Sequence, residues 1–188
     1  MKIKMELETE RLKLRPWRIE DAPALYKYAS DPKVGPIAGW PVHTDIEFSK
    51  QVIKDVFSAD GIYAIVPKGE EEPIGCIGLL IGDMSDFGIG PNEGEIAYWI
   101  GVPYWGQGLV PEAMRELMRY SFNDLGLKSL WCGYFEGNEK SVRAQEKCGF
   151  KYHSTNVNKP WPLMDDIRTE IITCISKDEW LNQVSHSE

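Results

Sequence analysis

Residues 100–113, IGVPYWGQGLVPEA, carry the clearest structural signal in the sequence. An apolar strand ends in its first residues, a turn with two glycines follows, and Pro111 stands in the first turn of a helix. Backbone N–H groups in such a turn point toward one spot, and the helix N-terminus adds about half a positive charge. Gly106 and Gly108 leave room for close approach to the backbone. The stretch therefore predicts a pyrophosphate site that needs no basic side chains.

A tight strand-to-helix connection without a ligand is the other interpretation of these glycines, because glycine adopts positive φ without strain. Two further nucleotide-binding loops do not fit the spacing. The chain has no GxGxxG pattern, and no Lys-Ser/Thr pair follows Gly108. We therefore expect neither a dinucleotide-binding fold nor a Walker loop.

The composition is that of a globular protein, with 43% hydrophobic and 27% charged residues among 188. We expect one domain over residues 1–188. The formal net charge of −8 argues against a nucleic-acid partner and suits a cationic substrate. The longest apolar runs, 74–81 and 96–102, are too short to cross a membrane. The first residues show no secretory signal, so we expect a cytoplasmic protein without a membrane partner.

The order of the expected elements indicates the fold class. Alternation, capping and turn residues predict helices over 20–30, 44–59, 111–125 and 139–148, with Thr44 and Glu47 as a capping box. They predict strands over 7–17, 62–66, 74–81, 95–101, 129–135, 150–157 and 167–176, and loops over 31–43, 82–94 and 158–166. This order predicts an α/β (α+β) fold in which a mixed sheet has helices on both faces.

The cysteines Cys76, Cys132, Cys148 and Cys174 show no CxxC or Cys/His spacing. Three of them stand in apolar strand-like runs. We expect free thiols, mostly buried, and no metal site.

A second motif, over residues 138–150, supports a ligand-binding interpretation of the glycine turn. Residues 138–150, NEKSVRAQEKCGF, resemble the N-x-x-S-x-x-x-x-E-K-x-G-F signature of the GNAT superfamily of N-acetyltransferases. Residues 104–113, YWGQGLVPEA, resemble the acetyl-CoA loop of that superfamily, most closely in its ribosomal-protein, RimJ/RimL-like branch. Trp105 stands where other branches have Gln or Arg, and Val110 replaces a final Gly or Ala. Residues 7–32 also resemble this branch, so the resemblance covers nearly the whole chain.

The resemblance implies a GNAT-type fold with a mainly antiparallel sheet of about seven strands. It also implies acetyl-CoA as co-substrate, held by residues of the loop, by Asn138 and by backbone groups of the preceding strand. Asn138 is equally suited to cap the helix that follows it. The expected cofactor-binding residues are Ile100, Val102, Trp105, Gly106, Gln107, Gly108, Leu109, Val110, Asn138 and Ser141.

Acetyl transfer needs a base for the amine proton and a donor for the departing thiolate. By resemblance, Glu95 is the candidate base, although a solvent-facing strand carboxylate would look the same in sequence. Many family members place a tyrosine as acid seven residues after the Asn, but here that position is Gln145. Ser141 is therefore the candidate donor. Trp40 and Trp161 from the variable loops, with Tyr98 from the strand, are the candidates for binding the amine.

The leading hypothesis is an acetyltransferase acting on a protein N-terminus or a small amine, including an aminoglycoside-like compound. The rival is a non-catalytic module that binds or senses acyl-CoA, which Gln145 in place of the tyrosine keeps open. The oligomeric state is also open, with a homodimer among the alternatives.

Overall fold

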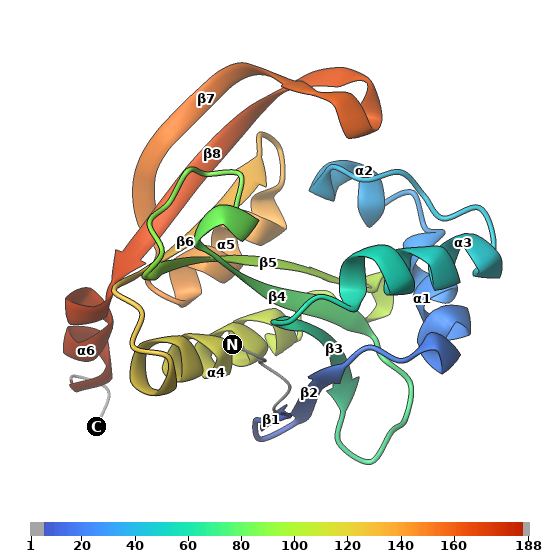
Figure 1. Ribbon diagram of the computed structural model, residues 1–188, viewed down its shortest axis with the longest axis horizontal. Helices are drawn as coiled ribbons and strands as arrows, with labels where there is room; N and C mark the ends of the chain where they lie inside the picture. The colour runs from blue at the N-terminus through green and yellow to red at the C-terminus, as the bar shows by residue number, and fades with distance from the viewer. Residues whose placement is uncertain (1–5, 186–188) are drawn as a thin grey trace.

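A mixed sheet of eight strands, in the order β1-β2-β3-β4-β5-β6-β8-β7, runs through the molecule (Figure 1). The computed structural model describes residues 6–185. The strands are β1 Leu7–Glu8, β2 Leu12–Pro16, β3 Ile62–Pro67, β4 Gly75–Ile81, β5 Glu93–Ile100, β6 Ser129–Phe135, β7 Lys151–Trp161 and β8 Asp166–Ser176. Neighbouring strands are antiparallel except for β5 and β6, which are parallel. The mainly antiparallel mixed sheet is as expected.

The helices lie on both faces of this sheet, which confirms the predicted fold class (Figure 1). They are α1 Ala22–Ala29, α2 Gly35–Ala38, α3 Ile46–Val52, α4 Leu109–Arg119, α5 Glu139–Lys147 and α6 Lys177–Ser185. π-helical turns, Ile53–Phe57 and Tyr120–Asp124, continue α3 and α4. Shorter 3-10 turns lie at Ile19–Asp21, Gly82–Met84, Val102–Tyr104 and Pro162–Met164. Within residues 6–185, none of the helices has the length and apolar character that crossing a bilayer requires.

Two apolar cores fill the two faces. Met114 and Leu117 of α4 belong to the larger core, and Leu25 of α1 belongs to the smaller one. Strand β4 contributes to both, because Cys76 faces the smaller core and Ile77 the larger, as the alternation of a strand requires. All four cysteines are free thiols, as predicted, although Cys174 is only partly buried.

Several predicted boundaries are wrong for local reasons. The strand predicted over 7–17 is broken at Thr9, whose backbone N–H donates to the Leu12 carbonyl and whose hydroxyl accepts from the Leu12 N–H, both at 2.9 Å. Helix α3 is capped by Asp45 and not by Thr44, since Asp45 Oδ1 accepts from the Phe48 N–H at 2.8 Å. Asp45 directly precedes the first residue of α3, so its side chain and not that of Thr44 reaches the free N–H groups of the first turn.

Two predicted loops contain regular structure. The loop over 31–43 holds α2, in which Pro36 fits the first turn and Gly39, at φ 94°, ends the helix in the left-handed conformation. The loop over 158–166 is mostly strand, because β7 and β8 pair as far as Trp161 and Asp166. Sequence analysis also missed α6.

The parallel junction between β5 and β6 is short. Only three residue pairs form it, and the last one joins Glu95 to Trp131. Gly94 lets the strand pack tightly here, because a Cβ atom at this position would lie 2.8 Å from Leu79 Cδ1. Beyond Glu95 the two strands separate, and the functional site lies in the gap.

Candidate active site

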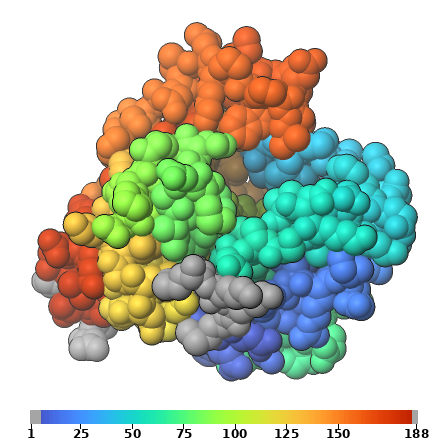
Figure 2. Space-filling view, viewed as in Figure 1, coloured from blue at the N-terminus to red at the C-terminus, as the bar shows by residue number. Residues whose placement is uncertain are grey.

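A cavity of about 200 Å³ occupies the gap between β5 and β6. Residues 95–98 of β5 and 133–135 of β6 form its walls, and Asn138 and Ser141 at the start of α5 close one side. Figure 2 shows a hollow between the β4–β5 loop in green, the β7–β8 hairpin in orange and the α2–α3 region in cyan. From these segments Ile37, Ala38, Phe87, Trp161 and Glu170 complete the lining.

The cavity passes from one face of the sheet to the other. Side chains alternate along β5, so Glu95 shares a face with Trp99, which packs against the smaller core. Tyr98 projects from the opposite face, where its hydroxyl meets Ser141 of α5. The two candidate catalytic residues, Glu95 and Ser141, therefore approach one cavity from opposite sides of the sheet.

The Glu95 side chain is half-buried at the cavity. Burial raises its pKa, and the negative charges of Asp86 and Glu170 raise it further. A hydrogen bond of 2.6 Å from the Ser85 hydroxyl to Glu95 Oε2 and the ammonium group of Lys159 act in the opposite direction. The net effect is a raised pKa, which suits a general base because it brings the proton affinity of the carboxylate closer to that of its substrate.

Ser141 lies in the first turn of α5 and is buried. Asn138 caps this helix, and its Oδ1 accepts from the Ser141 N–H at 3.3 Å. The capping role suggested for Asn138 is confirmed, and the same residue lines the cavity. The Ser141 hydroxyl lies 2.6 Å from the Tyr98 hydroxyl.

Gln145, at the position where many family members have tyrosine, is almost wholly buried. Its Nε2 donates to the Tyr98 hydroxyl and to the Gly133 carbonyl, each at 3.2 Å, and its Oε1 accepts from Thr173 at 2.7 Å. A tyrosine hydroxyl is thus present beside Ser141, but it belongs to Tyr98 of β5 and not to residue 145 of α5. Sequence analysis missed this link, and its only trace was Tyr98 three residues after Glu95.

The glycine turn has the geometry that its sequence indicated. Gly106 and Gly108 both have φ of 75°, in the left-handed region that favours glycine. A Cβ atom at Gly106 would meet no other atom within 4 Å, and one at Gly108 would meet only the Arg11 guanidinium, at 3.8 Å. Gly108 directly precedes α4. The turn is therefore open in front of a helix N-terminus, and its pyrophosphate site stays a prediction.

Side chains around the turn serve mainly to support it. Trp105 Nε1 donates to the Ile100 carbonyl at 2.9 Å, and the Lys140 ammonium lies 4.0 Å from the Trp105 ring centroid. Leu109 and Val110 are buried in the larger core. We infer that a ligand at this turn would meet backbone N–H groups and not these side chains.

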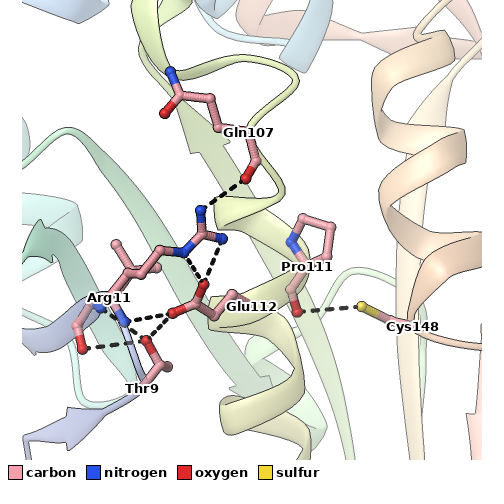
Figure 3. A network of polar contacts seen from close by, with 7 residues as sticks. Thr9, Arg11, Gln107, Pro111, Glu112 and Cys148 are labelled. Carbon is pink, nitrogen blue, oxygen red and sulfur yellow. Dashed lines mark hydrogen bonds and ion pairs between the residues drawn. The ribbon is translucent and has the colours of Figure 1, made fainter.

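An ionic network ties the turn to the N-terminal strands (Figure 3). Glu112 in the first turn of α4 accepts from the Thr9 hydroxyl at 2.5 Å and from the backbone N–H and Nε of Arg11 at 2.8 and 2.6 Å. Arg11 also donates to the Gln107 carbonyl at 3.1 Å. Gln107 is thus anchored through its backbone, while its side chain donates to the Pro103 carbonyl.

Backbone donors of β5 face the gap. The Gly101 N–H donates to the Ile74 carbonyl at 2.8 Å, which fixes the alternation of hydrogen bonds along the strand. Tyr98 and Ile100 therefore direct their N–H groups away from β4, toward the side where β6 has separated. Val102 lies two residues after Ile100 and begins a 3-10 turn. This geometry fits the predicted backbone role of Ile100.

The predicted amine-binding residues are not all in one place. Tyr98 and Trp161 line the cavity, and Trp161 Nε1 donates to the Gly39 carbonyl at 2.6 Å, which joins the β7–β8 hairpin to α2. Trp40 does not line the cavity, because its ring packs against Trp99 and His43. Sequence analysis did not single out Phe87, Tyr134, Phe135 or Glu170, which do line it. Within residues 6–185, no three His, Cys, Asp or Glu side chains are grouped to hold a metal ion.

Comparisons with known proteins agree with this geometry. A family model described as an acetyltransferase (GNAT) domain matches residues 11–151. The "Uncharacterized N-acetyltransferase p20" of Bacillus licheniformis is 30% identical over 150 residues, which cover 77% of this chain and 82% of that protein. The "Putative ribosomal N-acetyltransferase YdaF" of Bacillus subtilis is 38% identical over 59 residues, 31% of this chain and 32% of that protein.

The fold is also that of a solved relative. The crystal structure of a ribosomal-protein-S5-alanine acetyltransferase from Vibrio fischeri superposes with a TM-score of 0.71 at 20% identity, over 94% of this chain and 98% of that chain. The relative in sequence that is named a putative ribosomal N-acetyltransferase is consistent with the RimJ/RimL-like branch. The chain belongs to the GNAT family and is an acetyltransferase.

Proposed function

We propose that this enzyme transfers the acetyl group of acetyl-CoA to a primary amine bound beside Glu95, by direct attack in a complex that holds both substrates. The observation that carries the proposal is the cavity through the sheet. Glu95 reaches it from one face and Ser141 from the other, so a base and a hydrogen-bond donor flank the same space. Such a pair is what acyl transfer to an amine needs.

The amine side is built from a carboxylate and aromatic rings. Phe87, Tyr134 and Trp161 line the cavity together with Glu95. Aromatic faces and a carboxylate both attract an ammonium group, so this end suits an amine before it loses its proton. The raised pKa of Glu95 then makes the carboxylate a better proton acceptor.

The acetyl-CoA side has the features that an anionic, extended ligand needs. The open turn at Gly106 and Gly108 precedes the N-terminus of α4, which favours a pyrophosphate. The N–H groups of Tyr98 and Ile100 face the gap, where they suit the carbonyl groups of a pantetheine arm. Acetyl-CoA supplies an activated thioester, and these groups of the chain orient it.

In the transfer, the amine nitrogen forms a bond to the thioester carbon and the carbon–sulfur bond breaks. Glu95 accepts the proton that the nitrogen loses. Ser141 donates a hydrogen bond to the departing sulfur, which takes up one proton from solvent and leaves as a thiol, while Glu95 returns to solvent the proton that it accepted. Nothing is oxidised or reduced.

Among acceptors we favour the α-amine of a protein N-terminus over a bulky small molecule. A cavity of about 200 Å³ is below the range of about 300–1,000 Å³ that encloses drug-sized ligands, so it suits an acceptor that inserts only its amine end. An α-amine with a pKa of about 7.8 is also far more often neutral near pH 7.5 than a lysine side chain. Two of the similar proteins, a putative ribosomal N-acetyltransferase and a ribosomal-protein-S5-alanine acetyltransferase, point the same way.

An acceptor screen tests the proposal. Release of CoA from acetyl-CoA is measured with N-terminal peptides, polyamines, amino acids and aminoglycosides. We expect turnover on N-terminal peptides at micromolar to millimolar KM. Acetyl-CoA binding without turnover on any acceptor would support the non-catalytic acyl-CoA-binding module, and preference for an aminoglycoside would replace the acceptor class.

A further inference from the structure

The direction of a buried hydrogen-bond chain can be read from Gln145. The Gly133 carbonyl can only accept, so the atom of the Gln145 amide that faces it must be the nitrogen. The Thr173 hydroxyl, at 2.7 Å from the other end of the amide, donates to its oxygen. With both ends assigned, the second N–H of Gln145 donates to the Tyr98 hydroxyl at 3.2 Å.

Tyr98 has one proton to donate, and two oxygens of Ser141 compete for it. The Ser141 hydroxyl oxygen lies at 2.6 Å and the Ser141 carbonyl oxygen at 3.3 Å. At 2.6 Å either hydroxyl could donate to the other, but a phenol is more acidic than an aliphatic hydroxyl and is therefore the stronger donor, and the Tyr98 oxygen already accepts from Gln145. We therefore assign Tyr98 as the acceptor from Gln145 and the donor to Ser141 Oγ.

The last member of the chain is left with a free proton. Ser141 Oγ accepts from Tyr98, so its own hydrogen must point elsewhere. Within residues 6–185 no second partner lies within hydrogen-bond distance of Ser141 Oγ, and Ser141 lines the cavity. With this assignment, the Ser141 hydroxyl is left to donate toward the cavity that it lines.

We propose that Tyr98 is a positioning residue, which fixes the Ser141 hydroxyl as a hydrogen-bond donor toward the sulfur that leaves in acetyl transfer. The inference rests on the proposed function, because it takes Ser141 as that donor. Without Tyr98 the hydroxyl would rotate freely and spend part of its time bonded to water or to the helix backbone. A fixed donor needs no reorganisation when charge develops on the sulfur.

The environment of Tyr98 keeps it in the donating form. Burial raises the pKa of its phenol well above the ordinary value of 10, so the hydroxyl stays protonated throughout the pH range in which an amine is acetylated. The chain thus orients the Ser141 hydroxyl without giving up a proton of its own.

A double-mutant cycle tests the proposal. Ser141→Ala should lower kcat by about tenfold or more. Tyr98→Phe, which keeps the ring, should lower kcat by about tenfold with little change in the KM for acetyl-CoA. The double variant should be no slower than Ser141→Ala alone, because Tyr98 acts only through Ser141. Tyr63→Phe is the control, since it removes a buried phenol hydroxyl that has no hydrogen-bond partner and lies outside the site.

The outcomes separate this inference from the proposed function. If Tyr98→Phe is fully active, or if the two losses multiply in the double variant, the positioning role is overturned while Ser141 keeps its own. If Ser141→Ala is fully active, the donor assignment falls first and the positioning role falls with it. Should Tyr98→Phe not fold in a thermal melt, Gln145→Met, which removes the N–H that holds Tyr98, should show a smaller loss that again disappears in the Ser141→Ala background.

Discussion

The Ser85 hydroxyl donates a hydrogen bond of 2.6 Å to Oε2 of Glu95, across the loop that joins β4 to β5. Ser85 is itself fixed, because its oxygen accepts from the Phe87 N–H at 3.1 Å and so directs its proton to the carboxylate. Phe87 lines the cavity beside Glu95. One loop therefore sets both the proton affinity of the candidate base and part of the wall around its substrate.

Ser85→Ala should move the acid limb of the kcat/KM profile to higher pH. The Ser85 hydrogen bond stabilises the charged carboxylate and so lowers the pKa of Glu95 against the effect of burial. Without it the pKa rises further, and a larger part of the enzyme is protonated at a given pH. Well above this limb the variant should approach the rate of the wild-type protein. Ser58→Ala, in the exposed end of a helical segment, is the control, and an unmoved limb would separate Ser85 from the base.

Glu95→Gln should keep the affinity for acetyl-CoA and lower kcat/KM on the preferred amine by about 10² to 10⁴-fold. Part of this loss should return as the pH rises, because a neutral amine needs less help from a base. Parallel pH–rate profiles of variant and wild type provide the measurement. Asp83→Asn, which changes an exposed carboxylate in the same loop, should leave the profile unchanged. A variant with full activity at every pH would exclude Glu95 as the base.

Gly108→Trp should abolish acetyl-CoA binding while the protein stays folded. The bulky side chain would fill the space in front of α4. Its matched control is Gly126→Trp, because Gly126 has a similar φ of 70°, has the same open surroundings and lies at the other end of the same helical segment. Both variants carry the strain of a positive φ, on the order of 1–2 kcal/mol. Calorimetry should show binding only for Gly126→Trp, and equal affinities would remove the turn from the cofactor site.

Glu112→Gln should lower the melting temperature at pH 7, and the difference from the wild type should shrink in acid. Burial alone would raise the pKa of Glu112, but hydrogen bonds from Thr9 and Arg11 outweigh it and lower the pKa below 4.5. A lowered pKa stabilises the folded state above the unfolded value, and this gain is lost as the pH falls through the folded pKa. Melts at pH 7 and below pH 4.5 measure it. A difference that stays constant would mean that the charge of Glu112 is irrelevant to stability.

Sequence patterns identified the elements whose local signals are strong. The strand 129–135 and the helix that starts after Asn138 were predicted almost to the residue, because a run of strand-forming side chains and a capping residue define them. A helix start is harder to predict where two neighbouring residues both suit the N-cap, as Thr44 and Asp45 do before α3. Helix α6 has no buried residue to mark its face, which explains why it was missed.

The candidate site likewise has a part that could be predicted from sequence and a part that could not. Asn138 and Ser141 were found because they stand in a motif, and Glu95 because its place at the start of a strand resembles a family position; the structure brings all three to one cavity. The bond between Gln145 and Tyr98 joins residues 47 positions apart, and it depends on where β5 leaves β6. No local pattern encodes that separation, so Tyr98 was predicted only as a contact for the amine.

The three-pair junction between β5 and β6 has a mechanical consequence. Because only three residue pairs join the two strands, any change in the angle between them would be amplified at Tyr98, which lies three residues, or about 10 Å, beyond the junction. A rotation of about 5° would shift Tyr98 relative to α5 by about 1 Å, and misplacement on that scale can reduce catalysis about 10²-fold. The hydrogen bonds from Tyr98 to Ser141 and from Gln145 to Tyr98 join β5 to α5 across this opening and so limit such a shift. The packing at Gly94, where a Cβ atom would meet the side chains of Leu79, Leu127 and Leu130, therefore helps to set the precision of the enzyme.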